Sequence, residues 1–291
     1  MEEACSLCSD QAEQACFIAG GTDLLVQLKA SDIPALAQAS AGLAELVIDV
    51  TELPELRGIG RENGVLRIGA AATWSAVVGS EAVRESALAV LEAARTLGSV
   101  QVRNMATVGG NICHASPAAD LVPPLLALDA SLVVASASGT RVVPLHGFAL
   151  GVNRTVLAAG ELLVEIRLPA PEERSGCSFM KFGRTASDIA IVNAATTVEL
   201  DSDGVCRDAR IAMGAVGPTP MRAEGAEELL RGERLSDDLL EEAGRLAARA
   251  TQCITDVRAS AAYRQEVARV LVKRALEEAW RRARLNGDIQ R

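Results

Sequence analysis

Two pairs of adjacent glycines mark the parts of this sequence best suited to hold a ligand. The first lies in Ala19-Gly20-Gly21-Thr22-Asp23, and the second in Thr107-Val108-Gly109-Gly110-Asn111, which runs on through His114 and Ser116 to Asp120. A glycine pair lets the backbone turn sharply, and successive N–H groups in such a turn form a concavity that binds anions. Two such loops predict an extended ligand held at two points along its length, as a dinucleotide would be.

Other nucleotide-binding patterns are missing from the sequence. Gly58-Ile59-Gly60 begins like the dinucleotide fingerprint Gly-x-Gly-x-x-Gly, but Asn63 stands at the third glycine position. Neither a Walker A loop nor a nucleophile elbow is present. A glycine pair by itself is often only a turn, so the prediction depends on the longer strings around the two pairs.

The overall composition excludes two classes of function. With 29 basic against 38 acidic residues the net charge is −9, whereas a nucleic-acid-binding surface is basic. No apolar run is as long as a membrane span, and Met1-Glu2-Glu3-Ala4 does not begin a signal peptide. We therefore expect a cytoplasmic protein with no nucleic-acid partner and no membrane span.

The seven cysteines do not form a metal-binding pattern. They stand at positions 5, 8, 16, 113, 177, 206 and 253, and Cys5-x-x-Cys8 is the one close pair. A zinc or iron–sulfur site needs further cysteines or histidines at suitable spacing, which this segment lacks. We expect unpaired thiols and no metal site on this chain, because cytoplasmic proteins rarely hold structural disulfides.

Hydrophobic periodicity divides residues 1–170 into two units. In the smaller unit, 1–53, we expect a strand–helix–strand order, which favours parallel strands; its elements are a helix over 1–17, a strand at 17–19, a helix over 24–28 and a strand at 46–50. In the larger unit, 54–170, we expect strands at 65–70, 132–135, 141–143 and 162–168, and helices over 81–97 and 118–128, the last broken or kinked by Pro123-Pro124.

A proline-rich stretch, Pro169-Ala170-Pro171, with the polar residues after it, predicts a domain boundary. Beyond it, the pattern predicts strands at 191–200 and 209–216, then helices near 236–254 and 260–285. These elements give a second domain over 176–286. The fold class is α+β, with strands first and helices last.

The strings around the glycine pairs resemble the FAD-binding, or medium, subunits of the molybdenum hydroxylase family. The resemblance rests on residues 19–25, 107–120 and 179–190, and it extends in order over the whole chain. It is strongest toward the bacterial xanthine dehydrogenase type. The resemblance implies a two-part FAD-binding domain of the vanillyl-alcohol-oxidase type, followed by a small C-terminal domain of sheet and helices like that of the CO dehydrogenase flavoproteins.

The resemblance also implies a non-covalent FAD site. Residues 20–23 would cradle the diphosphate, and residues 107–111 would clamp its other side through backbone N–H groups and short polar side chains. Asp120 would accept hydrogen bonds from sugar or ribityl hydroxyls. Val164 and Lys181 would approach the flavin ring, where a lysine stabilises negative charge on reduced flavin. The full set is Ala19, Gly20, Gly21, Thr22, Asp23, Leu24, Thr107, Gly109, Gly110, Asn111, His114, Ser116, Asp120, Val164 and Lys181.

Several of these residues have a simpler alternative role. Asp23 suits a helix cap, and Asp120 suits the first turn of a helix. Lys181 is also typical of a solvated strand residue. His114 has no carboxylate partner near it in the sequence, so we expect a structural role or a hydrogen bond to the cofactor rather than proton donation.

The sequence departs from the family pattern in a few places. Leu97 stands where some relatives place an aromatic residue against the flavin. The segment before the first glycine pair is shorter than in the family, so we expect an incomplete first unit or a truncated start. No cluster-binding cysteine insertion of the benzoyl-CoA-reductase type is present. Arg184 and Asp188 suit either an ion pair that orders a loop over the flavin or a plain surface pair.

The resemblance implies an electron-transfer subunit with no catalytic residue of its own beyond FAD and a flavin-tuning Lys181. A large molybdopterin-binding subunit would hydroxylate xanthine or a related purine. A small subunit with 2Fe-2S clusters would pass electrons to FAD and on to NAD⁺, in a dimer of heterotrimers. Alternatives are another substrate (CO, nicotinate, an aromatic aldehyde or an acyl-CoA), another acceptor (oxygen, quinone or ferredoxin), or a flavin-free assembly protein.

Overall fold

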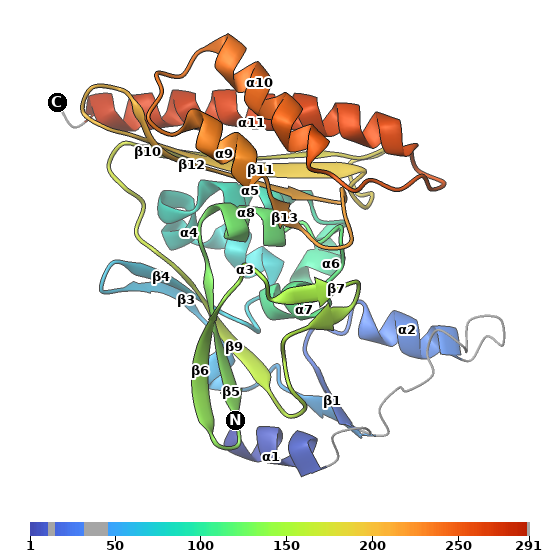
Figure 1. Ribbon diagram of the computed structural model, residues 1–291. Helices are drawn as coiled ribbons and strands as arrows, with labels where there is room; N and C mark the ends of the chain where they lie inside the picture. Colours follow the sequence, from blue (N-terminus) through green and yellow to red (C-terminus); the bar gives the residue numbers. More distant parts are fainter. Residues whose placement is uncertain (11–14, 32–45, 290–291) are drawn as a thin grey trace.

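The first unit of the chain is a small parallel pair of strands with two helices. The computed structural model describes residues 1–10, 15–31 and 46–289 (Figure 1). Helix α1 (Glu2–Asp10) precedes strand β1 (Ala15–Ile18), helix α2 (Leu24–Ser31) and strand β2 (Leu46–Asp49). Strands β1 and β2 are parallel, as predicted.

The helix predicted over 1–17 is wrong at its end. Ala15 and Cys16 belong to β1, where they lie opposite Leu46 and Val47, and residues 11–14 lie outside the described residues. Pairing with β2 explains the strand, because the apolar run from Ala15 to Ile18 can bury itself against a neighbouring strand.

A five-stranded antiparallel sheet forms the centre of the next unit. Its strands lie in the spatial order β3 (Ile59–Glu62), β4 (Val65–Gly69), β9 (Leu162–Leu168), β5 (Ser131–Ser136) and β6 (Gly139–Pro144). The four strands predicted at 65–70, 132–135, 141–143 and 162–168 are confirmed. A short 3₁₀ helix, η2 (Pro54–Leu56), leads into β3, and strands β7 (Ala149–Gly151) and β8 (Arg154–Thr155) form a small hairpin.

Six short helices connect β4 to β5. They are α3 (Trp74–Gly79), α4 (Glu81–Ser86), α5 (Leu88–Thr96), α6 (Val100–Met105), α7 (Val108–Cys113) and α8 (Val122–Ala127). The helix predicted over 81–97 is interrupted at Ala87, whose φ of −148° and ψ of 55° are not helical. The helix predicted over 118–128 begins only at Val122. Its two prolines stand in the first turn, where a missing N–H has no helical partner to lose.

The C-terminal part is a four-stranded antiparallel sheet covered by helices. The sheet order is β10 (Ser175–Phe182), β11 (Val192–Leu200), β12 (Cys206–Gly214) and β13 (Met221–Arg222), followed in the chain by α9 (Glu224–Leu230), α10 (Asp237–Arg249) and α11 (Ala261–Ile289). Helix α11 packs on β10 and β11, and α5 and α8 of the preceding unit contact the same sheet (Figure 1). The sheet therefore lies between α11 and the N-terminal part.

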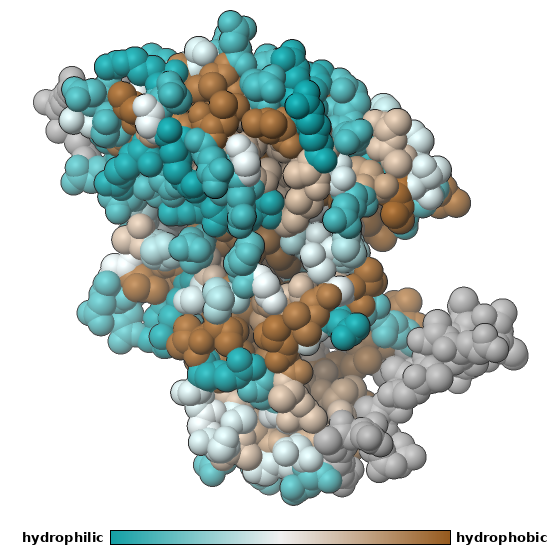
Figure 2. Space-filling model, viewed as in Figure 1, coloured by the Kyte–Doolittle hydropathy of each residue, from teal (hydrophilic) through white to brown (hydrophobic). Residues whose placement is uncertain are grey.

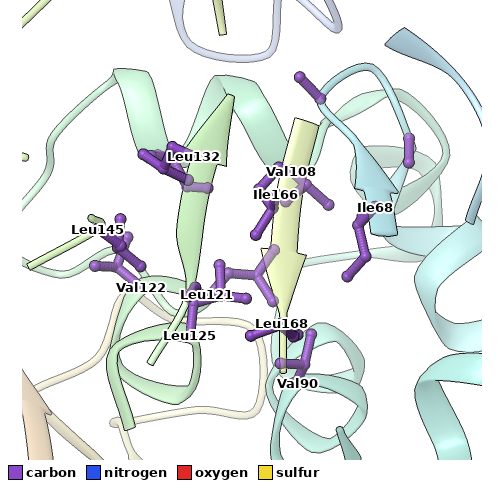
Figure 3. Close-up of a cluster of buried hydrophobic side chains, with 14 of the residues drawn as sticks. Ile68, Val90, Val108, Leu121, Val122, Leu125, Leu132, Leu145, Ile166 and Leu168 are labelled. Atoms are coloured by element: carbon purple, nitrogen blue, oxygen red, sulfur yellow. The ribbon is translucent and has the colours of Figure 1, made fainter. Parts of the chain in front are cut away.

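Two clusters of buried apolar side chains fill the interior. In one of them, Ile166 and Leu168 of β9 gather with Ile68, Val90, Val108 and Leu132 (Figure 3). This cluster also includes Phe179, Ala195 and Ala212 from the C-terminal sheet. The second cluster lies between that sheet and helices α9 to α11. Because the first cluster includes side chains from both parts, the contact between the parts is a packed interior.

Candidate functional site

The first glycine segment, residues 19–23, connects β1 to α2. Gly21 has a φ of +64°, in the left-handed region that glycine adopts without strain. A Cβ placed on Gly20 would lie 1.9 Å from the carbonyl oxygen of Met105, so no side chain fits there. The backbone of this segment therefore lies directly against the chain between α6 and α7.

The amides of this segment are free to bind a ligand. Within the described residues, the N–H groups of Gly20, Gly21, Thr22 and Asp23 donate no hydrogen bond. The carbonyl oxygens of Gly21 and Asp23 accept the first hydrogen bonds of α2. Successive unpaired amides before a helix form a site for an anionic group.

The second glycine pair lies inside helix α7 rather than in a loop. Thr107 caps this helix, since its hydroxyl accepts the amide of Gly110 at 3.1 Å. The amide of Gly109 donates to the carbonyl oxygen of Ala70 at 2.8 Å, and that of Asn111 to Thr107 at 3.1 Å. The prediction that the amides of Gly109, Gly110 and Asn111 clamp a ligand is therefore not supported, because each already has a partner.

Close packing explains why residue 109 is a glycine. A Cβ on Gly109 would lie 2.7 Å from the Cβ of Ala70 and 2.8 Å from its carbonyl oxygen. Helix α7 thus approaches the end of β4 without a side chain between them. In this segment, the donors left for a ligand include the Thr107 amide and hydroxyl and the side-chain N–H₂ of Asn111. The Oδ1 of Asn111 accepts the amide of Leu121.

A side-chain contact between a histidine and a carboxylate joins the two glycine segments. His114 ends α7, and its Nδ1 lies 2.8 Å from Oδ2 of Asp23. The same oxygen accepts a hydrogen bond from Nε2 of Gln27 at 2.7 Å. The sequence suggested no carboxylate near His114, and the structure supplies one from the other segment.

A second pair of predicted residues meets at the contact between the two parts of the chain. Nζ of Lys181, on β10, lies 2.7 Å from Oδ2 of Asp120 and 3.4 Å from the carbonyl oxygen of Thr96. The side chains of Lys181 and Asp120 are 7% and 5% exposed, so Lys181 is not a solvated strand residue. Nδ2 of Asn193 donates to the other oxygen of Asp120 at 2.9 Å. Burial raises the pKa of Asp120, and the charge of Lys181 and both hydrogen bonds act against that rise.

The remaining predicted residues lie apart from these two pairs. Val164 is buried in β9, where its carbonyl oxygen accepts the amide of Ala70 at 2.8 Å. The hydroxyl of Ser116 accepts the amide of Ala118 at 3.3 Å. Among the described residues, no hydrogen bond or ion pair connects Val164 with Lys181, or the Asp23 pair with the Asp120 pair. Arg184 and Asp188 do pair, at 3.1 Å, with Arg184 largely in solvent.

A cavity of about 640 Å³ lies where the two glycine segments meet. Gly20, Met105 and Thr107 line it, together with side chains that the sequence analysis missed: Arg57, Thr73, Ser80 and Asn104. Its volume falls in the range of small-molecule sites. Asn104 stands just before the second glycine string and was recognisable as a candidate, whereas Thr73 and Ser80 are brought in by the fold.

Two other cavities do not unite the predicted residues. Ser116 lines one of about 360 Å³, together with His146 and Arg222. A larger one, of about 950 Å³, lies between α4, β10 and the end of α11, and no predicted site residue lines it. Of these three cavities in the described part of the chain, the one at the glycine segments is lined by both predicted segments.

The cysteines and the long helices add no further site. In the described ranges, no group of three His, Cys, Asp or Glu side chains is arranged to hold a metal ion. Burial raises the pKa of Cys113 to about 12, which keeps it a thiol. None of the helices described has an apolar stretch sufficient to cross a membrane.

Comparison with known proteins identifies both parts of the chain. Residues 1–171 match the FAD binding domain in molybdopterin dehydrogenase, and residues 177–279 match the CO dehydrogenase flavoprotein C-terminal domain. The carbon monoxide dehydrogenase medium chain of Hydrogenophaga pseudoflava is 34% identical over 96% of this chain and 94% of the relative. The xanthine dehydrogenase FAD-binding subunit of Escherichia coli O157:H7 is 33% identical over 96% of this chain and 93% of the relative.

A solved structure shares the whole fold. A chain of carbon monoxide dehydrogenase from Hydrogenophaga pseudoflava superposes with a TM-score of 0.90 at 34% identity, over 97% of this chain and 94% of that one. The predicted fold class and the family resemblance are confirmed. The chain belongs to the molybdenum hydroxylase family as an FAD-binding subunit.

Proposed function

We propose that this chain is the electron-transfer subunit of a three-subunit molybdenum hydroxylase. It receives electrons from 2Fe-2S clusters on a small subunit and delivers them to NAD⁺. A large molybdopterin-binding subunit hydroxylates xanthine or a related purine. The observation that carries the proposal is the cavity lined by Gly20 and Thr107. It lies in the domain that matches the FAD-binding family. The xanthine dehydrogenase subunit at 33% identity supports the choice of substrate.

The residues around this cavity fit FAD. The free amides of residues 20–23 suit the diphosphate; Arg57 also stands on the cavity wall, where it is paired with Glu52. The Thr107 hydroxyl is a donor on the cavity wall, and the Asn111 N–H₂ group is a further donor four residues along the same segment. When bound, FAD supplies the ability to accept electrons one at a time and to release them as a pair.

The buried Lys181 is the second element of the proposed site. Its ammonium would stabilise negative charge on the flavin ring, since a positive charge in a desolvated place acts strongly. Asp120 holds this ammonium at 2.7 Å. Val164 and Leu97 would form the apolar wall near the ring. Under this proposal no side chain of the subunit transfers a proton, so its role is to bind and tune the cofactor.

The surface supports docking to other subunits. Large apolar side chains are exposed at Val100 and Met105 on α6 and at Leu150 and Val152 around β7. Apolar residues gather in a band at mid-height of the molecule, below the more hydrophilic C-terminal helices (Figure 2). Single exposed apolar residues are ordinary, but a contiguous band is typical of an interface.

We propose a dimer of heterotrimers for the complex. Within each copy of this chain, we propose domains at 1–170 and 176–286.

The first experiment is to purify the chain and identify its cofactor. Oxidised-flavin absorbance with release of FAD on denaturation is the expected result, and a colourless chain that takes up no added FAD would exclude the role and favour an assembly protein. The purified complex is then supplied with NAD⁺ and either xanthine or CO. Reduction of NAD⁺ by xanthine supports the proposed substrate.

Oxidation of CO is the second candidate activity. It is favoured by the 34% identity and the TM-score of 0.90 to carbon monoxide dehydrogenase. If the complex oxidises CO and leaves xanthine unchanged, the purine assignment is wrong and the electron-transfer role stands. An acceptor series of NAD⁺, a quinone and oxygen identifies where the electrons leave.

A further inference from the structure

Asn193 is a fully buried polar residue in the middle of the C-terminal sheet. It lies on β11 with 0% exposure, and its Nδ2 donates to Oδ1 of Asp120 at 2.9 Å. Within the described residues its Oδ1 accepts no hydrogen bond. A buried amide with one unsatisfied oxygen lowers the stability of the fold. The hydrogen bond to Asp120 is the contact that offsets this cost.

The strand register places Asn193 beside Lys181. These two residues lie directly opposite each other in the antiparallel pair β10 and β11. Side chains at opposed positions point to the same face of a sheet, with their Cβ atoms about 5 Å apart. Lys181 therefore reaches one carboxylate oxygen of Asp120 while Asn193 reaches the other.

Gly214 makes room for this arrangement. It is the partner of Asn193 on the next strand, β12, and a Cβ there would lie 2.4 Å from Oδ1 of Asn193. A side chain at this position would clash with the amide of Asn193 in its present place. The row Lys181, Asn193 and Gly214 thus crosses three strands and presents two donors to one carboxylate.

With the carboxylate held on both sides, the position of the ammonium is defined. If only Lys181 contacted Asp120, the carboxylate could rotate and carry the flexible lysine with it. The second hydrogen bond removes that freedom. Among the described residues, Lys181 is the charged group that acts on Asp120, and Asn193 is neutral. The hydrogen bond from Asn193 also favours the ionised form of Asp120.

We propose that Asn193 is a positioning residue for the flavin site: it fixes Asp120, and Asp120 in turn holds the Lys181 ammonium beside bound FAD. This inference rests on the proposed function, in which Lys181 faces the flavin. Asn193 does not touch the cofactor. It acts through Asp120, so its loss changes how FAD binding depends on pH.

The test compares Asn193→Leu, which removes the donor and keeps the branched shape of the side chain, with Thr196→Val as the matched control. Thr196 lies on the same strand, is equally buried, and its hydroxyl has no hydrogen-bond partner in the described structure. The dissociation constant of FAD is measured by fluorescence on the full chain between about pH 5 and 9. Asn193→Leu should bind FAD roughly tenfold more weakly, as expected for one hydrogen bond to a charged group.

The pH profile separates positioning from general damage. Loss of the donor raises the pKa of Asp120. As the pH is lowered, FAD binding in Asn193→Leu should therefore weaken at a higher pH than in the wild type. Thr196→Val should keep the wild-type profile. Asn193→Asp places a second carboxylate against Asp120, so its binding should be weakest at high pH and recover in acid, the opposite trend. If Asn193→Leu does not fold, this reversed profile decides the matter.

Two results would overturn the inference, and only one of them would also overturn the proposed function. Asn193→Leu or Asn193→Asp with wild-type affinity and profile would show that Asp120 needs no second partner, while leaving the flavin role intact. A wild-type chain that binds no FAD at any pH would overturn the proposed function, and the inference with it.

Discussion

The imidazole of His114 and the carboxylate of Asp23 lie 2.8 Å apart and join two segments that are distant in the sequence. The contact brings the end of α7 to the start of α2, beside the free amides of residues 20–23. A carboxylate next to a diphosphate would repel it, so the direction in which the Asp23 carboxylate points matters for binding. The contact with His114 holds that carboxylate in one place and ties the loop to α7.

We predict that His114→Ala weakens FAD binding without unfolding the chain. The pair is partly exposed, so its loss should cost about 0.5–1 kcal/mol, a change of roughly two- to fivefold in the dissociation constant. Fluorescence titration with FAD measures this. His146→Ala is the control, because that histidine lines a different cavity. Equal effects of the two substitutions would contradict a role for the pair.

We predict a larger effect for Gly20→Ala. The added methyl group would lie 1.9 Å from the carbonyl oxygen of Met105, so the loop must move away from its neighbour. Overpacking of this kind costs about 1–3 kcal/mol, and FAD binding should fall with it. Gly225→Ala is the matched control, since this glycine lies on α9, does not line the cavity, and a Cβ there meets nothing within 4 Å. Thermal unfolding and FAD titration are measured on both variants, and similar curves for the two would refute the packing argument.

The sequence predicted the central strands well because their residues have a strong preference of their own. The run Leu132-Val133-Val134 is apolar and includes two β-branched valines, and it lies in β5 as expected. Strand β10 escaped prediction, since Ser175-Gly176-Cys177-Ser178 has little strand preference. Pairing with β11 and the close approach of α11 to Gly176 determine it instead. Tertiary contacts of this kind are not visible in a local pattern.

The same limit applies to the candidate site. The strings around the glycine pairs identified Asp23, His114, Asp120 and Lys181, but not which of them meet. Which residues meet is decided by strand register and by how the chain folds back over long sequence distances. Asn193 was missed because, in the sequence, it is only one polar residue within a strand. The free amides at residues 20–23 and the occupied ones at 109–111 also look alike in the sequence, and only the fold distinguishes them.

We predict that Arg282 is needed to hold the two parts of the chain together. From α11 its guanidinium reaches Glu92 of α5 at 2.6 Å and the carbonyl oxygen of Cys177 at 2.6 Å. Glu92 also accepts the amide of Phe179 at 2.8 Å. Arg282→Met leaves the partly buried Glu92 without its cation, which should lower the free energy of unfolding by about 2–3 kcal/mol.

Urea denaturation measures this loss. Arg84→Met, at an exposed residue whose ion-pair partner among the described residues is the exposed Glu81, should change the free energy of unfolding by less than about 0.5 kcal/mol. The double variant Glu92→Gln with Arg282→Met should be more stable than Arg282→Met alone, because no unpaired charge remains. A double variant that is less stable than the single one would argue against this explanation.

We predict that Glu278 makes the stability of the C-terminal helix sensitive to acid. Hydrogen bonds from Arg281, together with the charge of Arg282, lower its pKa from 4.5 to about 2. An acid whose pKa is lowered by folding stabilises the fold fully above its unfolded pKa, and that contribution is lost as the pH falls through the folded value. Glu278→Gln should therefore be less stable than the wild type at pH 7. Near pH 2 the difference in stability between the two should be much smaller.

The control is Glu277→Gln, whose nearest cation among the described residues is Lys273 at 3.8 Å. A deficit for Glu278→Gln that is equal at both pH values would mean that the ion pairs with Arg281 and Arg282 contribute nothing through charge.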